Sequence, residues 1–198
     1  MATNSVTGRP REFDRDSVIE AAMQVFWSNG YDGTSTQALC ENIGLGKSSL
    51  YNAFGSKQQL YELALQHYQD LALTSQKKIL NGPGTPRERL RAFLQWGVDE
   101  DLSGTEHRTC MALFAGLERA PKVPAVQTMV RGHFTHLETA LCEVFTAGQQ
   151  VGDIASDRSP LSKARAFLSQ YFGLRILGQS MPDREVLQDA LEGALSRL

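Results

Sequence analysis

The chain has 198 residues, of which 41% are apolar, so it is long enough for one large domain or for a small domain joined to a larger one. Twenty Lys and Arg side chains against twenty-two Asp and Glu give a net charge of −2, so the overall charge does not indicate a nucleic-acid partner. No apolar run approaches the ~18 residues of a membrane helix, and the polar N-terminus lacks the apolar stretch of a signal peptide. We therefore expect a cytoplasmic protein.

Helical periodicity dominates the chain, and no run of alternating residues bounded by hairpin turns predicts a strand. The expected fold is all-α with about nine helices, in which residues 1–55 form a three-helix domain and residues 56–198 a larger helical bundle. Capping residues, glycines and prolines place the helices near residues 14–29, 35–43, 47–54, from 56 onward, 86–102, 107–119, 124–149, 160–178 and 183–197. The helix that follows Ser56 should turn Leu60, Leu63, Ala64, His67 and Leu71 inward.

The third helix is unusually polar. Its inner face offers only Leu50, Ala53 and Phe54. The outward side chains have the length and hydrogen-bonding groups that reach phosphates and base edges, and they are Lys47, Ser48, Ser49, Tyr51 and Asn52. With the preceding helix and its glycine-containing turn, this helix has the arrangement of a helix-turn-helix motif.

Local charge favours the same interpretation, although residues 1–60 sum to −1. The stretch 44–57 contains two lysines and no acid, and residues 1–11 contain Arg9 and Arg11 and no acid, which suits a reading face and a basic arm. A polar loop and short helix within a larger bundle would produce a similar pattern, so the pattern alone leaves both interpretations open.

Three segments resemble the tetracycline-repressor (TetR) family of bacterial transcription regulators: AAMQVFWSNGYDGTS at 21–35, ENIGLGKSSLYNAF at 41–54 and GSKQQL at 55–60. The resemblance implies a helix-turn-helix domain that binds DNA. It implies that Lys47, Ser48, Ser49 and Asn52 lie at or near bases, that Tyr51 and Lys57 hold phosphates, and that Ser35, Thr36 and Gln37 meet the backbone or groove. Thr36 and Asn52 depart from the residues common in the family, which affects the expected sequence preference.

The C-terminal part resembles the family more weakly. Residues 108–124 are similar to a Gly-Cys-Leu-Leu type segment of one subgroup, with Arg108 and Thr109 departing from it, and the last two helices resemble the pair through which members dimerise. Apolar residues there exceed what one interior face needs, which favours a homodimer on a palindromic operator. They are Leu168, Tyr171, Phe172, Leu174, Ile176, Leu177, Val186, Leu187, Ala190, Leu191 and Leu195.

By the same resemblance, the central helices surround a cavity for an apolar or aromatic effector. The candidate lining residues are Phe93, Trp96, Cys110, Met111, Phe114, Met129, His133 and Phe134. Each of them could equally be a plain core residue, because periodicity does not separate the two roles.

The cysteines and histidines allow two further hypotheses. Cys40, Cys110 and Cys142 are an odd number without a C-x-x-C pair, so we expect reduced thiols. His107 with Cys110, and His133 with His136, have spacings that could bind a metal, but core or surface histidines explain them as well, and we expect no metal and no cofactor. Cys110 could sense oxidants or electrophiles, or it could be a small buried apolar residue.

The resemblance implies a ligand-responsive DNA-binding regulator, and we expect a repressor. The chain contains no phosphate loop, nucleophile elbow or H-E-x-x-H motif that would indicate an enzyme. An effector would favour a position of the fourth helix that spreads the two reading helices of the dimer. The alternative is a helical ligand-binding or catalytic protein that does not read DNA.

Overall fold

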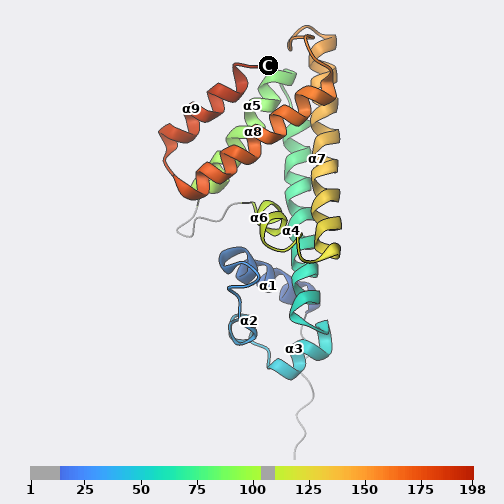
Figure 1. Cartoon of the computed structure of the whole chain (residues 1–198), viewed down its shortest axis with the longest axis vertical. Helices are drawn as coiled ribbons and strands as arrows, with labels where there is room; N and C mark the ends of the chain where they lie inside the picture. Colours follow the sequence, from blue (N-terminus) through green and yellow to red (C-terminus); the bar gives the residue numbers. More distant parts are fainter. Residues whose placement is uncertain (1–13, 104–109) are drawn as a thin grey trace, which may run out of the picture.

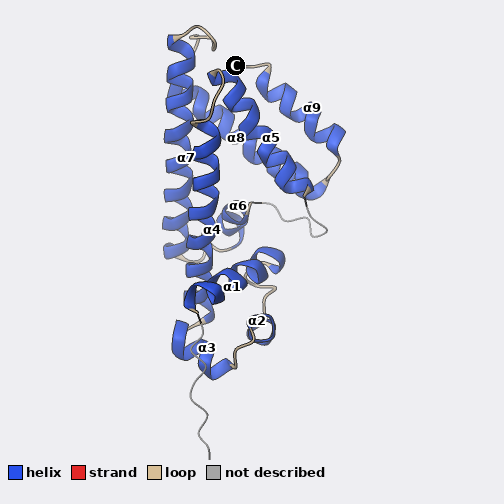
Figure 2. Ribbon diagram, turned by 180° about the vertical axis from the view of Figure 1, so that it is seen from behind, coloured by secondary structure: helices blue, strands red, loops and turns tan. Residues whose placement is uncertain are grey.

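The computed structural model describes residues 14–103 and 110–198, and within these ranges it contains nine α-helices and no strand (Figures 1 and 2). The helices are α1 (Arg15–Asn29), α2 (Thr36–Ile43), α3 (Lys47–Phe54), α4 (Lys57–Leu80), α5 (Pro86–Leu102), α6 (Met111–Glu118), α7 (Pro124–Gln150), α8 (Pro160–Ser180) and α9 (Arg184–Leu195). The all-α fold that the sequence predicts is confirmed. The helix expected over 107–119 begins at Met111 instead, because the described residue Cys110 is its N-cap and is not helical. Residues 104–109 lie outside the described part.

The helix boundaries follow local capping chemistry. The side chains of Asp14, Ser35 and Ser56 each accept a hydrogen bond from a backbone N–H in the first turn of α1, α2 and α4. At the start of α5, Thr85 and Glu88 form a reciprocal capping box, and Pro86 occupies the first helical position. These caps explain why the predicted starts of α1, α2, α4 and α5 agree with the structure to within one residue.

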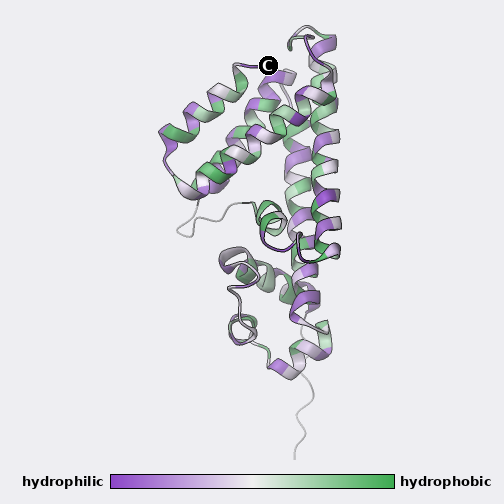
Figure 3. Cartoon of the chain, in the orientation of Figure 1, coloured by the Kyte–Doolittle hydropathy of each residue, from purple (hydrophilic) through white to green (hydrophobic). Residues whose placement is uncertain are grey.

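The α4 helix links the two parts of the molecule. Figure 1 shows it rising from the small group formed by α1, α2 and α3 into the larger body, where it lies beside α7. In the body, α8 packs against α7 and α5, and α9 packs across α5 and α8. Figure 3 shows hydrophobic residues recurring along each helix between hydrophilic ones, and α6 as the most continuously hydrophobic of the short helices.

The described core residues form two clusters. The first joins α1 to α4 with α6 and the start of α7, and the second joins α5, α7, α8 and α9. The first cluster continues past residue 55, so the core shows no break in packing at this position. The expected division into domains 1–55 and 56–198 stays a prediction. One expected core position in α4 is wrong: Leu71 is 48% exposed, because the inward face of α4 continues through Ala72 and Gln76 instead.

The last two helices bury most of the apolar residues that the sequence suggested for a subunit contact. Leu187, Leu191 and Leu195 are almost fully buried within the chain, because α9 folds back onto α5 and α8. Ile176 on α8 and Met181 after it are about half exposed. The apolar surface left for a partner is therefore smaller than the sequence indicated.

Candidate functional site

The α2 and α3 helices form a helix-turn-helix at the far end of the molecule from α9 (Figure 1). Gly44 ends α2 in the left-handed conformation, with φ +74°, and its N–H donates to the Cys40 carbonyl. Two residues later Gly46 is the N-cap of α3. A glycine at position 44 therefore sets the direction in which α3 leaves the turn.

The outward face of α3 is the polar surface that the sequence predicts. Leu50 and Phe54 are buried beneath it, and the exposed side chains are Lys47, Ser48, Ser49 and Asn52. No acidic residue lies in α3. These four side chains offer hydroxyl, amide and ammonium groups to a partner along two helical turns.

Tyr51 has a different place from its neighbours. It is half-buried, and its hydroxyl lies 2.7 Å from Thr36 Oγ1 at the start of α2. The two side chains therefore join α2 to α3 across the turn. Of the neighbouring predicted residues, Ser35 caps α2 with its side chain, and Gln37 donates to Glu41 within the same helix.

Arg15 supports α3 from the first helix, although the sequence gave no signal for this role. Its guanidinium donates to the Ala53 carbonyl at 2.9 Å and lies 4.7 Å from the centre of the Phe54 ring. The last turn of α3 is therefore held against α1. The predicted contacts Arg9 and Arg11 lie outside the described residues.

Lys57 is directed at the protein itself. Its ammonium donates to the Tyr31 carbonyl at 2.6 Å and lies 4.1 Å from the centre of the Tyr31 ring, and burial lowers its pKa. Lys57 thus ties the start of α4 to the turn between α1 and α2, a role that the sequence did not indicate.

A second connection to that turn comes from the end of α6. The Glu118 carboxylate accepts hydrogen bonds from the backbone N–H groups of Tyr31 and Asp32, at 3.0 and 2.8 Å. The guanidinium of Arg119 lies 3.8 Å from the Tyr31 ring centre and donates to Gln58 on α4. Through these contacts α6, which belongs to the body, is joined directly to the helix-turn-helix part.

The interior of the body contains a buried ion pair. Arg175 on α8 contacts the Asp101 carboxylate at 2.7 Å and donates to the Tyr171 hydroxyl at 2.9 Å. Burial raises the pKa of Tyr171 to about 12, although the Arg175 cation opposes the change. Gly97 and Gly178 leave room for this cluster, since a Cβ at Gly178 would lie 2.5 Å from Asp101.

Cys110 precedes α6 next to this cluster and is only 2% exposed. Burial raises the pKa of Tyr68 well above its usual range, and the neighbouring Cys110 contributes to the increase. Cys40 and Cys142 are only half-buried. The thiol of Cys110 therefore lies among Tyr68, Tyr171 and Arg175, whereas the other two thiols are closer to the surface.

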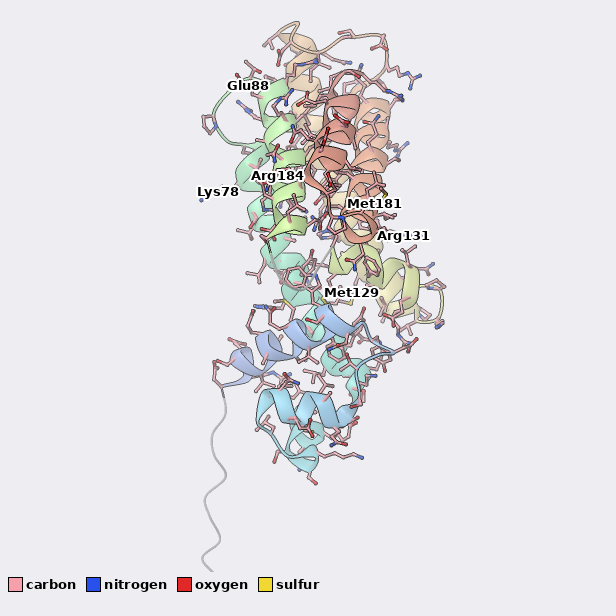
Figure 4. All side chains as sticks on the ribbon, turned by 90° about the vertical axis from the view of Figure 1, so that its left-hand side faces the viewer. Lys78, Glu88, Met129, Arg131, Met181 and Arg184 are labelled. Atoms are coloured by element: carbon pink, nitrogen blue, oxygen red, sulfur yellow. The ribbon has the colours of Figure 1, made fainter. Side chains whose placement is uncertain are left out.

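The eight residues expected to line an effector cavity do not form one group: Cys110 and Met111 belong to the first core cluster, Phe93 belongs to the second, and Phe114 is 40% exposed. Phe93 is fully buried against Tyr171, and the half-buried Phe134 packs at a tilt against Phe172. Met111 and Phe114 line a cavity between α1 and α6, and Phe134 also lines an outer groove along α6 and α7. Figure 4 labels Met129, whose carbonyl accepts a hydrogen bond from Gln69 on α4.

His133 is the one candidate of the eight with a strongly shifted pKa among the described residues. It is 3% exposed on α7, neither ring nitrogen has a hydrogen-bond partner, and burial lowers its pKa to about 4. The imidazole is therefore neutral at pH 7. His136 is exposed, His107 lies outside the described residues, and no cluster of three metal-ligating side chains occurs in 14–103 and 110–198.

None of the described helices combines the length and the low charge that a bilayer span requires.

Comparison with known proteins gives a consistent result. Residues 18–64 match the sequence profile described as "Bacterial regulatory proteins, tetR family". YezE of Bacillus subtilis, an uncharacterized HTH-type transcriptional regulator, is 27% identical over 192 residues, which cover 96% of this chain and 99% of YezE. ComR of Escherichia coli, an HTH-type transcriptional repressor, is 40% identical over 76 residues, which cover 35% of this chain and 36% of ComR.

Solved structures extend the likeness to the whole chain. A cysteine mutant of the TetR family transcriptional regulator CifR, in complex with a 26-bp double-strand operator DNA, is 33% identical to this chain and has a TM-score of 0.84. The match covers 96% of this chain and 98% of CifR.

Proposed function

The chain belongs to the TetR family of bacterial transcriptional regulators, and from this premise we propose that it is a repressor that binds a palindromic operator as a homodimer and leaves it when a small apolar or aromatic effector binds. Members of the family are regulators rather than enzymes. The observation that carries the proposal is the exposed polar face of α3, whose side chains face away from both core clusters.

In this proposal α3 enters the major groove. Lys47, Ser48, Ser49 and Asn52 contact bases or the adjacent backbone, because their exposed donors and acceptors have the reach for base edges. Ser35, Thr36 and Gln37 at the start of α2 meet the DNA backbone, and Tyr51 and Lys57 contact phosphates. The CifR complex with operator DNA supports this mode of binding by similarity.

A homodimer would bring two α3 helices to adjacent grooves. The proposed contact is the outer face of α8 with α9. Ile176 is 46% exposed on that face, and Met181, labelled in Figure 4, is 52% exposed just beyond it. Ile176→Glu should shift the protein from dimer to monomer in sedimentation velocity, whereas Leu117→Glu on the equally apolar surface of α6 should leave the dimer intact.

Effector release would act through the helices that join the two parts. The α4 helix spans both parts, and the end of α6 is bonded to the turn between α1 and α2, so a shift of either helix would move α3 relative to its partner. An effector that binds the shifted state more tightly would lower operator affinity. The loss is limited by the difference between the effector's binding free energies for the two states.

Operator binding tests the proposal. Sequences selected from a random duplex library should converge on a palindrome, and binding should be measured by anisotropy as a function of salt. Asn52→Ala should change the ranking of operator variants, whereas Lys47→Met should weaken all of them and reduce the slope of log affinity against log salt by about 0.9 per site. Lys78→Met serves as the control, since Lys78 is exposed on the distal half of α4 (Figure 4).

Failure to bind any duplex at low salt, with the dimer intact, would favour a helical ligand-binding protein instead. Equal effects of Lys47→Met and Lys78→Met on operator affinity would contradict the assignment of α3 as the recognition helix.

A second candidate is a regulator that senses electrophiles through Cys110. The position of this thiol at the N-cap of α6 supports it, because an adduct there would displace the helix whose end is bonded to the turn before α2. In the test with N-ethylmaleimide, the Cys110 sulfur adds to one carbon of the maleimide double bond and a proton adds to the other carbon, so the thiol S–H adds across the double bond with no leaving group. Loss of operator binding in the wild type and in the double variant C40S/C142S, but not in Cys110→Ser, would support this candidate. Equal loss in Cys110→Ser would exclude it.

A further inference from the structure

A cavity of about 350 Å³ lies where the helix-turn-helix part meets the body. Of the eight residues expected to line an effector cavity, only Met111 and Phe114 line this one. It is lined by residues of α1, α4, α6 and the end of α8. The volume falls within the range of small-molecule pockets, which runs from about 300 to 1,000 Å³. Six of the lining residues carry the argument that follows: Phe26, Trp27, Ser28, Tyr61, Phe114 and Glu118.

Four aromatic side chains line the cavity: Phe26, Trp27, Tyr61 and Phe114. Phe26 and Tyr61 pack edge to face, with ring centres 5.1 Å apart, and Trp27 packs in the same way against Tyr68. Because these rings are held by their neighbours, they present fixed faces and edges to the cavity. Phe114 adds a ring that is 40% exposed, an unusual exposure for an aromatic side chain of this chain's core helices. The wall therefore favours a flat or rounded apolar body.

The polar side chains at the cavity include those of Ser28, Asn29, Gln179 and Glu118. Among the described lining residues, only Glu118 is ionic. The side-chain NH₂ of Asn29 donates one hydrogen bond to the Val25 carbonyl, and its side-chain oxygen can act as an acceptor. Burial raises the pKa of Tyr61, and the Glu118 charge adds to the increase, whereas the Arg119 charge opposes it.

Two cations lie near Glu118 but outside the cavity lining. Arg119 and Lys57 lie over the Tyr31 ring and donate to Gln58 and to the Tyr31 carbonyl, and neither of them lines the cavity. Aromatic faces combined with a carboxylate bind organic cations, because the ring quadrupole and the anion both attract positive charge.

We propose that the cavity between α1, α4, α6 and α8 is a binding site for a small organic cation with an aromatic body, an amine or quaternary ammonium held by Glu118 and the rings of Trp27 and Tyr61. The cation would bind the Glu118 carboxylate, which also accepts hydrogen bonds from the backbone N–H groups of Tyr31 and Asp32. Binding would therefore weaken the connection between α6 and the turn before α2. Only this last effect, on DNA, rests on the proposed function.

The test uses benzyltrimethylammonium as the probe and neopentylbenzene as its uncharged isostere. Titration is followed by calorimetry and by tryptophan fluorescence in Trp96→Phe, in which Trp27 is the one remaining tryptophan of the two in the chain. We expect the cation to change the Trp27 emission and to bind at least about tenfold more tightly than the isostere. Equal binding of the two probes would overturn the proposed ligand class.

Three variants locate the site. Glu118→Gln should weaken cation binding about tenfold or more, whereas the charge-matched control Glu143→Gln, on an exposed position of α7, should not change it. Ser28→Trp places a large ring at the exposed rim of the cavity and should abolish binding without disturbing the core, which circular dichroism would verify. Unchanged cation affinity in Ser28→Trp, or no binding by the wild type, would overturn the proposal.

The same probe separates this inference from the proposed function. If the cation binds and lowers operator affinity, the result supports both the cavity assignment and the proposed function. If the operator binds normally but the cation does not bind, only the cavity assignment fails. If the cation binds at Trp27 and no duplex is bound, the site stands and the proposed function fails.

Discussion

The hydroxyl groups of Thr36 and Tyr51 lie 2.7 Å apart and join the first residue of α2 to the middle of α3. Apart from the short turn, the other connection between these helices is their shared apolar core, in which Leu39 and Leu50 are buried. The hydrogen bond therefore helps to set the angle at which α3 presents its polar face.

Tyr51→Phe removes this hydrogen bond while keeping the ring. The free energy of unfolding should fall by about 0.5–1.5 kcal/mol, and operator affinity should fall as well because α3 is less firmly held. Urea denaturation and anisotropy measure the two effects. A double-mutant cycle with Thr36→Val should show a coupling of similar size; additive effects would mean that the two hydroxyls do not interact.

Lys57 offers a test of a residue with two assigned roles. In the structure its ammonium binds the Tyr31 carbonyl, and in the proposed complex it contacts a phosphate. Lys57→Met should lower the free energy of unfolding by about 1.5–3 kcal/mol and reduce the salt slope of operator binding by about 0.9. Lys47→Met should reduce the slope without the loss of stability, because the Lys47 side chain is exposed. An unchanged slope in Lys57→Met would leave this residue with its structural role only.

The buried pair of Asp101 and Arg175 should be sensitive to the loss of either partner. Asp101→Ala leaves a guanidinium that is 2% exposed without its carboxylate, and the free energy of unfolding should fall by about 3–5 kcal/mol. Asp99 on the same helix pairs with Arg184 at 3.4 Å, but both side chains are more than half exposed, so Asp99→Ala should cost less than about 1 kcal/mol. Similar losses in the two variants would contradict the burial of the first pair.

His133 predicts a pH dependence of stability. Its pKa is about 4 in the folded chain and about 6.5 in the unfolded chain, so the unfolded state binds the proton first as pH falls. This histidine therefore costs no stability above about pH 7, and its destabilising effect grows as pH falls from 6.5 toward 4. At pH 5 the loss should be about 2 kcal/mol.

Comparison with His133→Gln isolates this effect from the titration of carboxylates. The difference in unfolding free energy between the wild type and His133→Gln should change by about 2 kcal/mol between pH 8 and pH 5. A constant difference would show that His133 is not desolvated in the folded protein.

Much of this protein was determined by its sequence alone. Helix ends are local events, so Ser35, Ser56 and the Thr85–Glu88 capping box could be recognised without any tertiary information. The polar face of α3 was also predictable, because Leu50 and Phe54 are spaced to bury one side and leave Ser48, Ser49 and Asn52 on the other.

The tertiary structure decided which polar groups meet. Glu118 and Tyr31 are separated by 87 positions and Asp101 and Arg175 by 74, and no local pattern pairs residues so far apart. Burial was likewise decided by packing: an apolar residue such as Leu187 could face its own core or a second subunit, and the way α9 folds onto α5 assigned it to the core. Side-chain periodicity specifies a helix's apolar face, but the element that covers the face depends on how the whole chain closes around it.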